Sequence, residues 1–86
     1  MKDLRNWTEV TKGLYRYITE ADECYEIHVL CWYYRTDILS AEANAYFVGN
    51  WRTNVGGLFE RELLATGSVS ACIDAAMKDC VWEASK

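Results

Sequence analysis

The eleven residues CYEIHVLCWYY, from Cys24 to Tyr34, constrain the fold of this chain more than any other segment. They are rich in side chains that favour strands, and only Glu26 and His28 suggest that either side meets water. Successive side chains of a strand point to opposite faces, so one face carries Tyr25, Ile27, Val29, Cys31 and Tyr33. The other face carries Cys24, Glu26, His28, Leu30, Trp32 and Tyr34. The segment predicts a central strand with apolar side chains on both faces.

The residues before this segment predict a second strand that pairs with it. Residues 9–19 are rich in β-forming side chains and alternate in character. One side of this strand carries Val10, Leu14 and Ile18, and the other carries Tyr15 and Tyr17. The polar residues 20–23 predict a turn, so the two strands form an antiparallel hairpin.

The second half of the chain is less sharply patterned. Residues 43–51 predict a third strand, with a short helix capped by Ser40 as the alternative at its start. Asn54 and the pair Gly56 and Gly57 tolerate positive φ and predict a tight reversal. Residues 58–66 alternate as a fourth strand would, yet most of them are good helix formers, so a helix is the alternative there.

The last segment, residues 67–86, predicts an amphipathic helix with Ser68 as its N-cap. Its apolar stripe consists of Val69, Cys72, Ile73, Ala76, Met77 and Cys80. The predicted fold class is α+β: an antiparallel sheet of three to four strands in a ββββα meander, with this C-terminal helix packed on one face. With 86 residues, the chain is expected to form a single domain over residues 1–86.

One helix covers one face of a sheet, which leaves the second apolar face of the central strand without a partner. We expect the helix to cover the face that carries Tyr25, Ile27 and Val29. The opposite face then gathers aromatic side chains, and such patches commonly mark an interface. Interface hot spots are enriched in Trp, Tyr and Arg. The predicted partner-binding residues are Trp32, Tyr34, Tyr15, Tyr17, Tyr46 and Arg35.

Charge and cysteine usage narrow the function classes. The net charge of −4 lacks the basic footprint of a protein that holds phosphate backbones. The N-terminus has no apolar run typical of a signal peptide, and the longest uncharged run, residues 63–73, is too short to span a bilayer. We therefore expect a cytoplasmic protein without a membrane partner. The four cysteines lack a C-x-x-C pair and are expected to be reduced, mostly buried thiols.

Catalytic chemistry finds little support in the sequence. His28 and Glu26 are two residues apart on the same face and are expected to lie side by side, which is more often a surface pair than a catalytic one. The chain has no phosphate-binding glycine loop and no metal-ligand spacing, so we expect no enzyme, no cofactor and no metal.

The sequence therefore favours a small protein-binding module that uses an aromatic sheet face to bind a protein partner or to form a homodimer. Single-stranded nucleic-acid binding through the same rings is the alternative. Small acidic binders of this kind are common among accessory proteins of phages and mobile elements, including inhibitors of host defence systems, and we expect that context.

Overall fold

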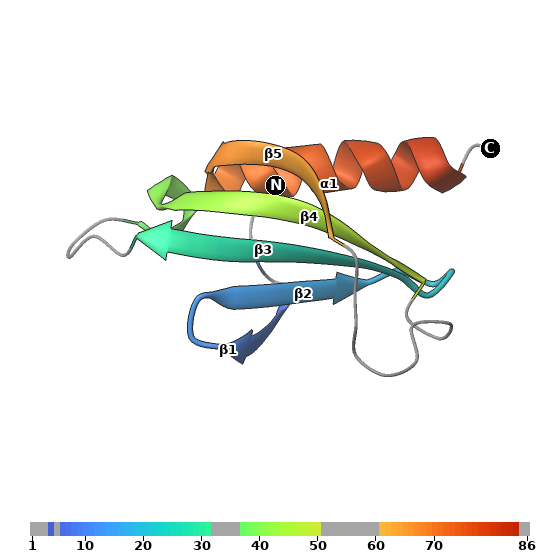
Figure 1. The fold of residues 1–86 in the computed structure, drawn as a ribbon, viewed down its shortest axis with the longest axis horizontal. Helices are drawn as coiled ribbons and strands as arrows, with labels where there is room; N and C mark the ends of the chain where they lie inside the picture. Colours follow the sequence, from blue (N-terminus) through green and yellow to red (C-terminus); the bar gives the residue numbers. More distant parts are fainter. Residues whose placement is uncertain (1–3, 5, 32–36, 51–60, 85–86) are drawn as a thin grey trace.

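The computed structural model describes residues 4, 6–31, 37–50 and 61–84, and for residues 31 and 81–84 it describes the backbone alone. Within these residues, five strands form one antiparallel sheet in the order of the sequence, and a long helix follows (Figure 1). The elements are β1 (Thr8–Thr11), β2 (Leu14–Ile18), β3 (Glu23–Cys31), η1 (Ile38–Ser40), β4 (Glu42–Asn50), β5 (Glu62–Ser68) and α1 (Val69–Ala84). The predicted α+β class, with an antiparallel sheet and a C-terminal helix, is confirmed.

The predicted number of three to four strands is wrong, because residues 9–19 contain a turn. β1 and β2 are separated by Lys12 and Gly13, and Gly13 has a φ of 85°. Glycine adopts this left-handed conformation without a steric penalty, so the chain reverses there. The predicted strands at 43–51 and 58–66 correspond to β4 and β5, while residue 51, residues 58–60 and the predicted reversal at 54–57 lie outside the described residues.

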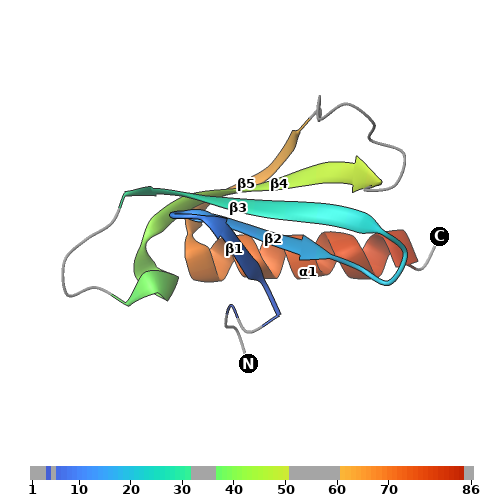
Figure 2. The ribbon, with the colours of Figure 1, turned by 90° about the horizontal axis from the view of Figure 1, so that it is seen from below.

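The core lies between the sheet and α1, which packs mainly on β4 and β5. Figure 2 shows the sheet nearly edge-on, with α1 on one side of it. Leu4 and Trp7, which precede β1, pack into the core on that side. The small side chains of Ala43 and Ala45 on β4 let the helix approach closely, and the Cys72 thiol donates a hydrogen bond to the Ala43 carbonyl at 3.5 Å. The buried members of the core are Trp7, Tyr25, Ile27, Ala41, Ala43, Ala45, Val69, Cys72, Ile73 and Ala76.

The start of α1 follows the prediction. The Ser68 hydroxyl accepts a hydrogen bond from the backbone N–H of Ala71 at 3.1 Å, as an N-cap does. Four predicted stripe residues, Val69, Cys72, Ile73 and Ala76, are buried, and Met77 and Cys80 are partly buried against the core. Among the described residues, no helix combines the length and the apolar character needed to cross a bilayer.

The central strand β3 turns the predicted side chains towards α1. Its neighbour β2 turns towards α1 the side chains that were predicted on the opposite face. Tyr25 and Ile27 are buried in the core and Val29 packs against it, whereas Tyr15 and Tyr17 were expected on the opposite face. Tyr15 pairs with Ile27 and Tyr17 pairs with Tyr25, and directly paired side chains share a face. Tyr15 and Tyr17 therefore lie on the helix side, and their predicted position is wrong.

The cause of this error is a difference of one residue in the hairpin. A turn at residues 20–23 would place residue 19 opposite Cys24, but Ile18 occupies that position. Asp22 adopts a φ of 63°, and the N–H of Thr19 donates to the carbonyl of Glu23 at 2.9 Å, which leaves three residues, 20–22, in the loop instead of the predicted four. A shift of one residue moves every side chain of a strand to the other face.

Candidate functional site

The sheet face that points away from α1, here the outer face, carries two rows of side chains that follow the strand register. One row crosses all five strands through Thr8, Arg16, Glu26, Tyr46 and Leu63. The next row contains Leu14, His28, Asn44 and Thr66. Polar and charged side chains therefore occupy the middle of this face.

Glu26 lies at the centre of the outer face and is 0% exposed. Its Oε2 accepts hydrogen bonds from Arg16 Nη2 at 3.0 Å and Nε at 3.2 Å. Its Oε1 accepts one from Arg61 Nε at 2.7 Å and lies 2.9 Å from His28 Nε2. We call Arg16, Glu26, His28 and Arg61 the ionic cluster. The predicted proximity of Glu26 and His28 is confirmed, but the expected contact of Glu26 with water is wrong.

The ionic cluster fixes the charge of its carboxylate. Burial by itself would raise the pKa of Glu26, but the hydrogen bonds from Arg61, His28 and Arg16 outweigh it and lower the pKa to about 2. A carboxylate with this pKa stays ionised near neutral pH and is a poor proton acceptor there. Cys24, on the same face, has its pKa raised to about 11 by burial and by the charge of Glu26, against the effect of both arginines. Its thiol is therefore protonated near neutral pH.

A chain of polar contacts extends the cluster towards β5. The rings of His28 and Tyr46 are tilted against each other, with centroids 4.7 Å apart. Asn44 Nδ2 donates to the Tyr46 hydroxyl at 3.1 Å, and the Thr66 hydroxyl donates to Asn44 Oδ1 at 2.6 Å. These contacts join side chains of β3, β4 and β5, so the middle of the outer face is held in one arrangement.

Exposed apolar side chains surround this polar centre. Among the described residues, the large hydrophobic side chains that are exposed are Val10, Ile18, Leu30 and Leu63, at 41% to 59%. Leu63 pairs with Tyr46, while Ile18 follows Arg16 by two residues, so both point to the outer face. Val10 lines a groove of about 340 Å³ with Arg16 and Ile18. Leu30 lies at a bulge between Val29 and Cys31, where alternation does not fix the direction of its side chain. Val10, Ile18 and Leu63 therefore belong to the outer face.

The predicted partner-binding residues divide into three groups. Tyr46 lies on the outer face beside His28. Tyr15 and Tyr17 lie on the other side of the sheet, against the core. The predicted anchor Trp32, together with Tyr34 and Arg35, lies outside the described residues.

Sequence reasoning missed Arg16 and Arg61 as partners of Glu26. The correct hairpin register alone would have placed Arg16 opposite Glu26. Arg61 is 35 residues away in the sequence, and only the pairing of β5 with β4 brings it to the cluster. The sequence contains no local signal for that contact.

The described residues offer few side chains for metal binding or thiol chemistry. No group of three or more metal-ligating side chains occurs among the described residues. Cys24, Cys72 and Cys80 are free thiols, and the first two are buried, as predicted. The chain matches no family model, and no curated protein or solved structure is detectably similar to it.

Proposed function

We propose that this chain is a non-enzymatic protein-binding module and that its outer face is the binding surface. The observation that carries the proposal is that Val10, Ile18 and Leu63, three of the four exposed large hydrophobic residues of the described chain, share this face. Removing such side chains from water is the main favourable term in most protein association. Their common position on a rigid sheet favours a docking surface over scattered exposure.

The dimensions of the outer face suit a protein. Five strands spaced about 4.8 Å apart give a width of roughly 20 Å, and the nine residues of β3 extend over about 30 Å. This area of roughly 600 Å² approaches the ~800 Å² that each partner buries in a standard interface. A small ligand would leave most of the exposed apolar side chains in water.

The charge of the ionic cluster indicates the chemistry of the partner. Two guanidinium groups, from Arg16 and Arg61, donate to the one buried carboxylate of Glu26, and the two arginine side chains are 20% and 35% exposed. An apolar partner surface with a carboxylate would complement this centre. A separate protein with such a surface is the proposed occupant, and a second copy of the chain is the alternative.

The same cluster argues against catalysis at His28. Glu26 orients the imidazole, as the carboxylate of a catalytic dyad does, but the nearest thiol along the strand, Cys24, has a raised pKa and lies on the far side of Glu26. Near neutral pH the described side chains around His28 therefore offer no activated nucleophile. A binding role accounts for both the exposed apolar side chains and the ionic cluster, whereas a catalytic role accounts only for the pairing of Glu26 with His28.

The test places a photo-crosslinking amino acid at position 63 on the outer face or, as the matched control, at Ala71 on the exposed side of α1. We expect the probe at position 63 to form a discrete adduct with a protein in the cells that express the chain. Ile18→Glu should abolish this adduct without changing the circular dichroism spectrum, and the probe at position 71 should give none. Equal adducts from both positions would refute the proposal.

The mass of the adduct shows whether the bound partner is a second copy of the chain, a nucleic acid or a different protein. An adduct of twice the chain mass, together with a dimer by light scattering, would identify a second copy. An adduct with nucleic acid that disappears steeply as salt rises would support single-strand binding, because phosphate contacts release counterions. An adduct with a different protein that persists in high salt supports the proposed module.

A further inference from the structure

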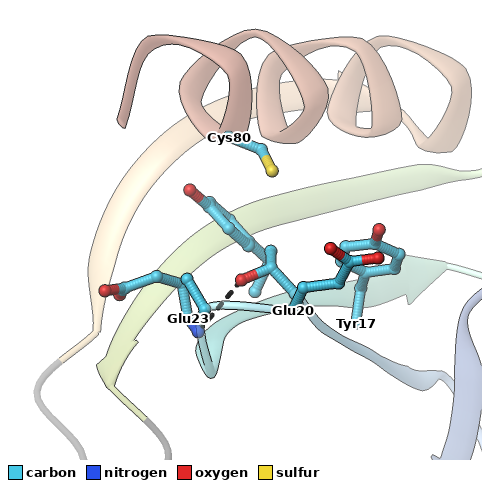
Figure 3. Close-up of a pocket in the computed structure, with 7 residues that line it drawn as sticks. Tyr17, Glu20, Glu23 and Cys80 are labelled. Carbon is cyan, nitrogen blue, oxygen red and sulfur yellow. Dashed lines mark hydrogen bonds between the residues drawn. The ribbon is translucent and has the colours of Figure 1, made fainter. Parts of the chain in front are cut away.

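A cavity of about 450 Å³ opens on the helix side of the sheet, away from the outer face. It lies between the connection from β2 to β3 and the C-terminal half of α1 (Figure 3). Its lining residues are Tyr17, Thr19, Glu20, Ala21, Glu23, Tyr25 and Cys80. The volume is within the range of about 300–1000 Å³ that small-molecule sites occupy.

The packing of the helix explains why the cavity exists. α1 lies mainly over β4 and β5 and packs less on β3, so the β2–β3 side of the sheet is the less covered one. In Figure 3, the Cys80 side chain points from the helix towards the sheet, with Tyr17 and Glu20 on one side and Glu23 on the other. The N–H of Glu23 donates to the Thr19 hydroxyl at 3.1 Å, which holds the floor of the cavity in place.

The chemistry of the lining is anionic and aromatic. Glu20 and Glu23 contribute carboxylates, and none of the seven lining residues in the described part of the chain is cationic. The buried Tyr25 hydroxyl donates to Asp79 Oδ2 at 2.8 Å, which brings a third carboxylate next to the cavity. Tyr17 and Tyr25 add aromatic surface to the wall, and each ring also packs against another aromatic ring, Trp7 and Phe47 respectively.

Cys80 adds apolar surface to this wall. Burial, and secondarily the charge of Asp79, raise the pKa of its thiol. The thiol therefore stays neutral near pH 7 and acts as a contact for an apolar stem.

We infer that this cavity binds an organic cation, an ammonium group on an apolar stem, with the stem against Tyr17, Tyr25 and Cys80 and the charge near Glu20, while Glu23 on the other side adds a longer-range attraction. The ammonium belongs either to a free amine or to a lysine side chain of another protein. The site lies on the opposite side of the sheet from the proposed protein-binding surface. The two proposals are therefore independent, and each can be refuted without affecting the other.

The first test is a titration followed by ¹⁵N NMR with 2-phenylethylamine, using 2-phenylethanol as the neutral isostere and 3-phenylpropionate as the anion. We expect the amine to shift the resonances of residues 19–23 and 80 and to bind about tenfold or more tightly than the alcohol, because each carboxylate adds a Coulomb attraction. The propionate should not bind. Equal binding of the amine and the alcohol, or no shifts with the amine at millimolar concentration, would overturn the inference.

Charge-neutral variants locate the site. Glu20→Gln combined with Glu23→Gln should weaken amine binding about tenfold and leave the fold intact, because both side chains lie at a turn and at least partly in water. Glu42→Gln, an exposed carboxylate on β4, is the matched control and should leave binding unchanged. Comparing the affinity for the free amine with the affinity for a blocked lysine amide shows whether the cavity prefers a free amine or a lysine side chain.

Cys80 supplies a second readout that does not depend on affinity. A cationic methanethiosulfonate reagent should modify Cys80 faster than an anionic one, and the double Gln variant should remove most of this preference, as measured by peptide mass mapping. Both reagents require the same thiolate, so their ratio reports the local potential and not the acidity of the thiol. An anionic reagent that reacts as fast as the cationic one would contradict an anionic cavity.

Discussion

Replacing Glu26 with Gln tests the reasoning about the ionic cluster most directly. Gln keeps the size of the side chain but removes the charge that Arg16 and Arg61 share. The pKa of Glu26 is lowered from 4.5 to about 2, and each pKa unit is worth about 1.4 kcal/mol, so the charged form contributes roughly 3 kcal/mol to folding. Removal of one partner from a buried ion pair typically costs about 3–5 kcal/mol. We expect Glu26→Gln to lower the free energy of unfolding by about 3 kcal/mol at pH 7.

The pH dependence of this effect has a definite sign. The folded-state pKa of Glu26 lies below the unfolded value, so its contribution is complete above pH 4.5 and is lost as the pH falls towards 2. With these two pKa values, about 2 kcal/mol is lost by pH 3. The variant has no proton to gain at position 26. The gap in stability between wild type and variant should therefore narrow by about 2 kcal/mol between pH 7 and pH 3.

Urea unfolding at 25 °C, followed by circular dichroism in steps from pH 7 to pH 3, measures both quantities. Glu42→Gln is the control, because this exposed carboxylate on β4 should change stability by less than about 0.5 kcal/mol. The difference between the two variants removes the titration of the other acidic residues. A gap below 1 kcal/mol at pH 7, or a gap that stays constant down to pH 3, would refute the account of Glu26 as a charge held by three donors.

Three further substitutions test the local structure by the same unfolding assay. Gly13→Ala should cost about 1–2 kcal/mol, because a Cβ disfavours the φ of 85°, and an unchanged midpoint would contradict the turn. Ser68→Ala should cost about 1 kcal/mol and speed hydrogen exchange at the Ala71 amide, which loses its acceptor; unchanged exchange would exclude the cap. Tyr25→Phe should cost about 1 kcal/mol by removing the donor to Asp79, and a neutral result would show that this contact adds nothing to stability.

Side-chain alternation was enough to predict the two faces of β3. Tyr25 and Ile27 face the helix and Glu26 faces away, because strand geometry fixes these directions once the strand exists. Alternation says nothing about how one strand aligns with the next. That depended on the left-handed conformation of Asp22 and the length of the hairpin connection, and an error of one residue moved Tyr15 and Tyr17 to the wrong face.

The candidate site was less predictable because its parts come from three strands. The pairing of Arg16 with Glu26 follows from local hairpin geometry, whereas Arg61 reaches Glu26 only after β5 has paired with β4. The segment around Arg61 has helix-forming composition, so the strand is selected by tertiary pairing over local preference. A surface defined by such pairing is visible only in the folded sheet.

The ionic cluster also explains why β2 and β3 adopt one alignment. Slipping β2 by one residue would move Arg16 to the helix side and leave Oε2 of the buried Glu26 carboxylate without its two hydrogen bonds from Arg16, at a cost of several kcal/mol. We therefore expect the triple variant Arg16→Leu, Glu26→Leu, Arg61→Leu to retain the fold but to lose this selection. Nuclear Overhauser contacts between Tyr17 and Tyr25 should weaken, and a second set of β2 resonances should appear. A single set of sharp resonances with the native contacts would show that packing on the helix side alone fixes the register.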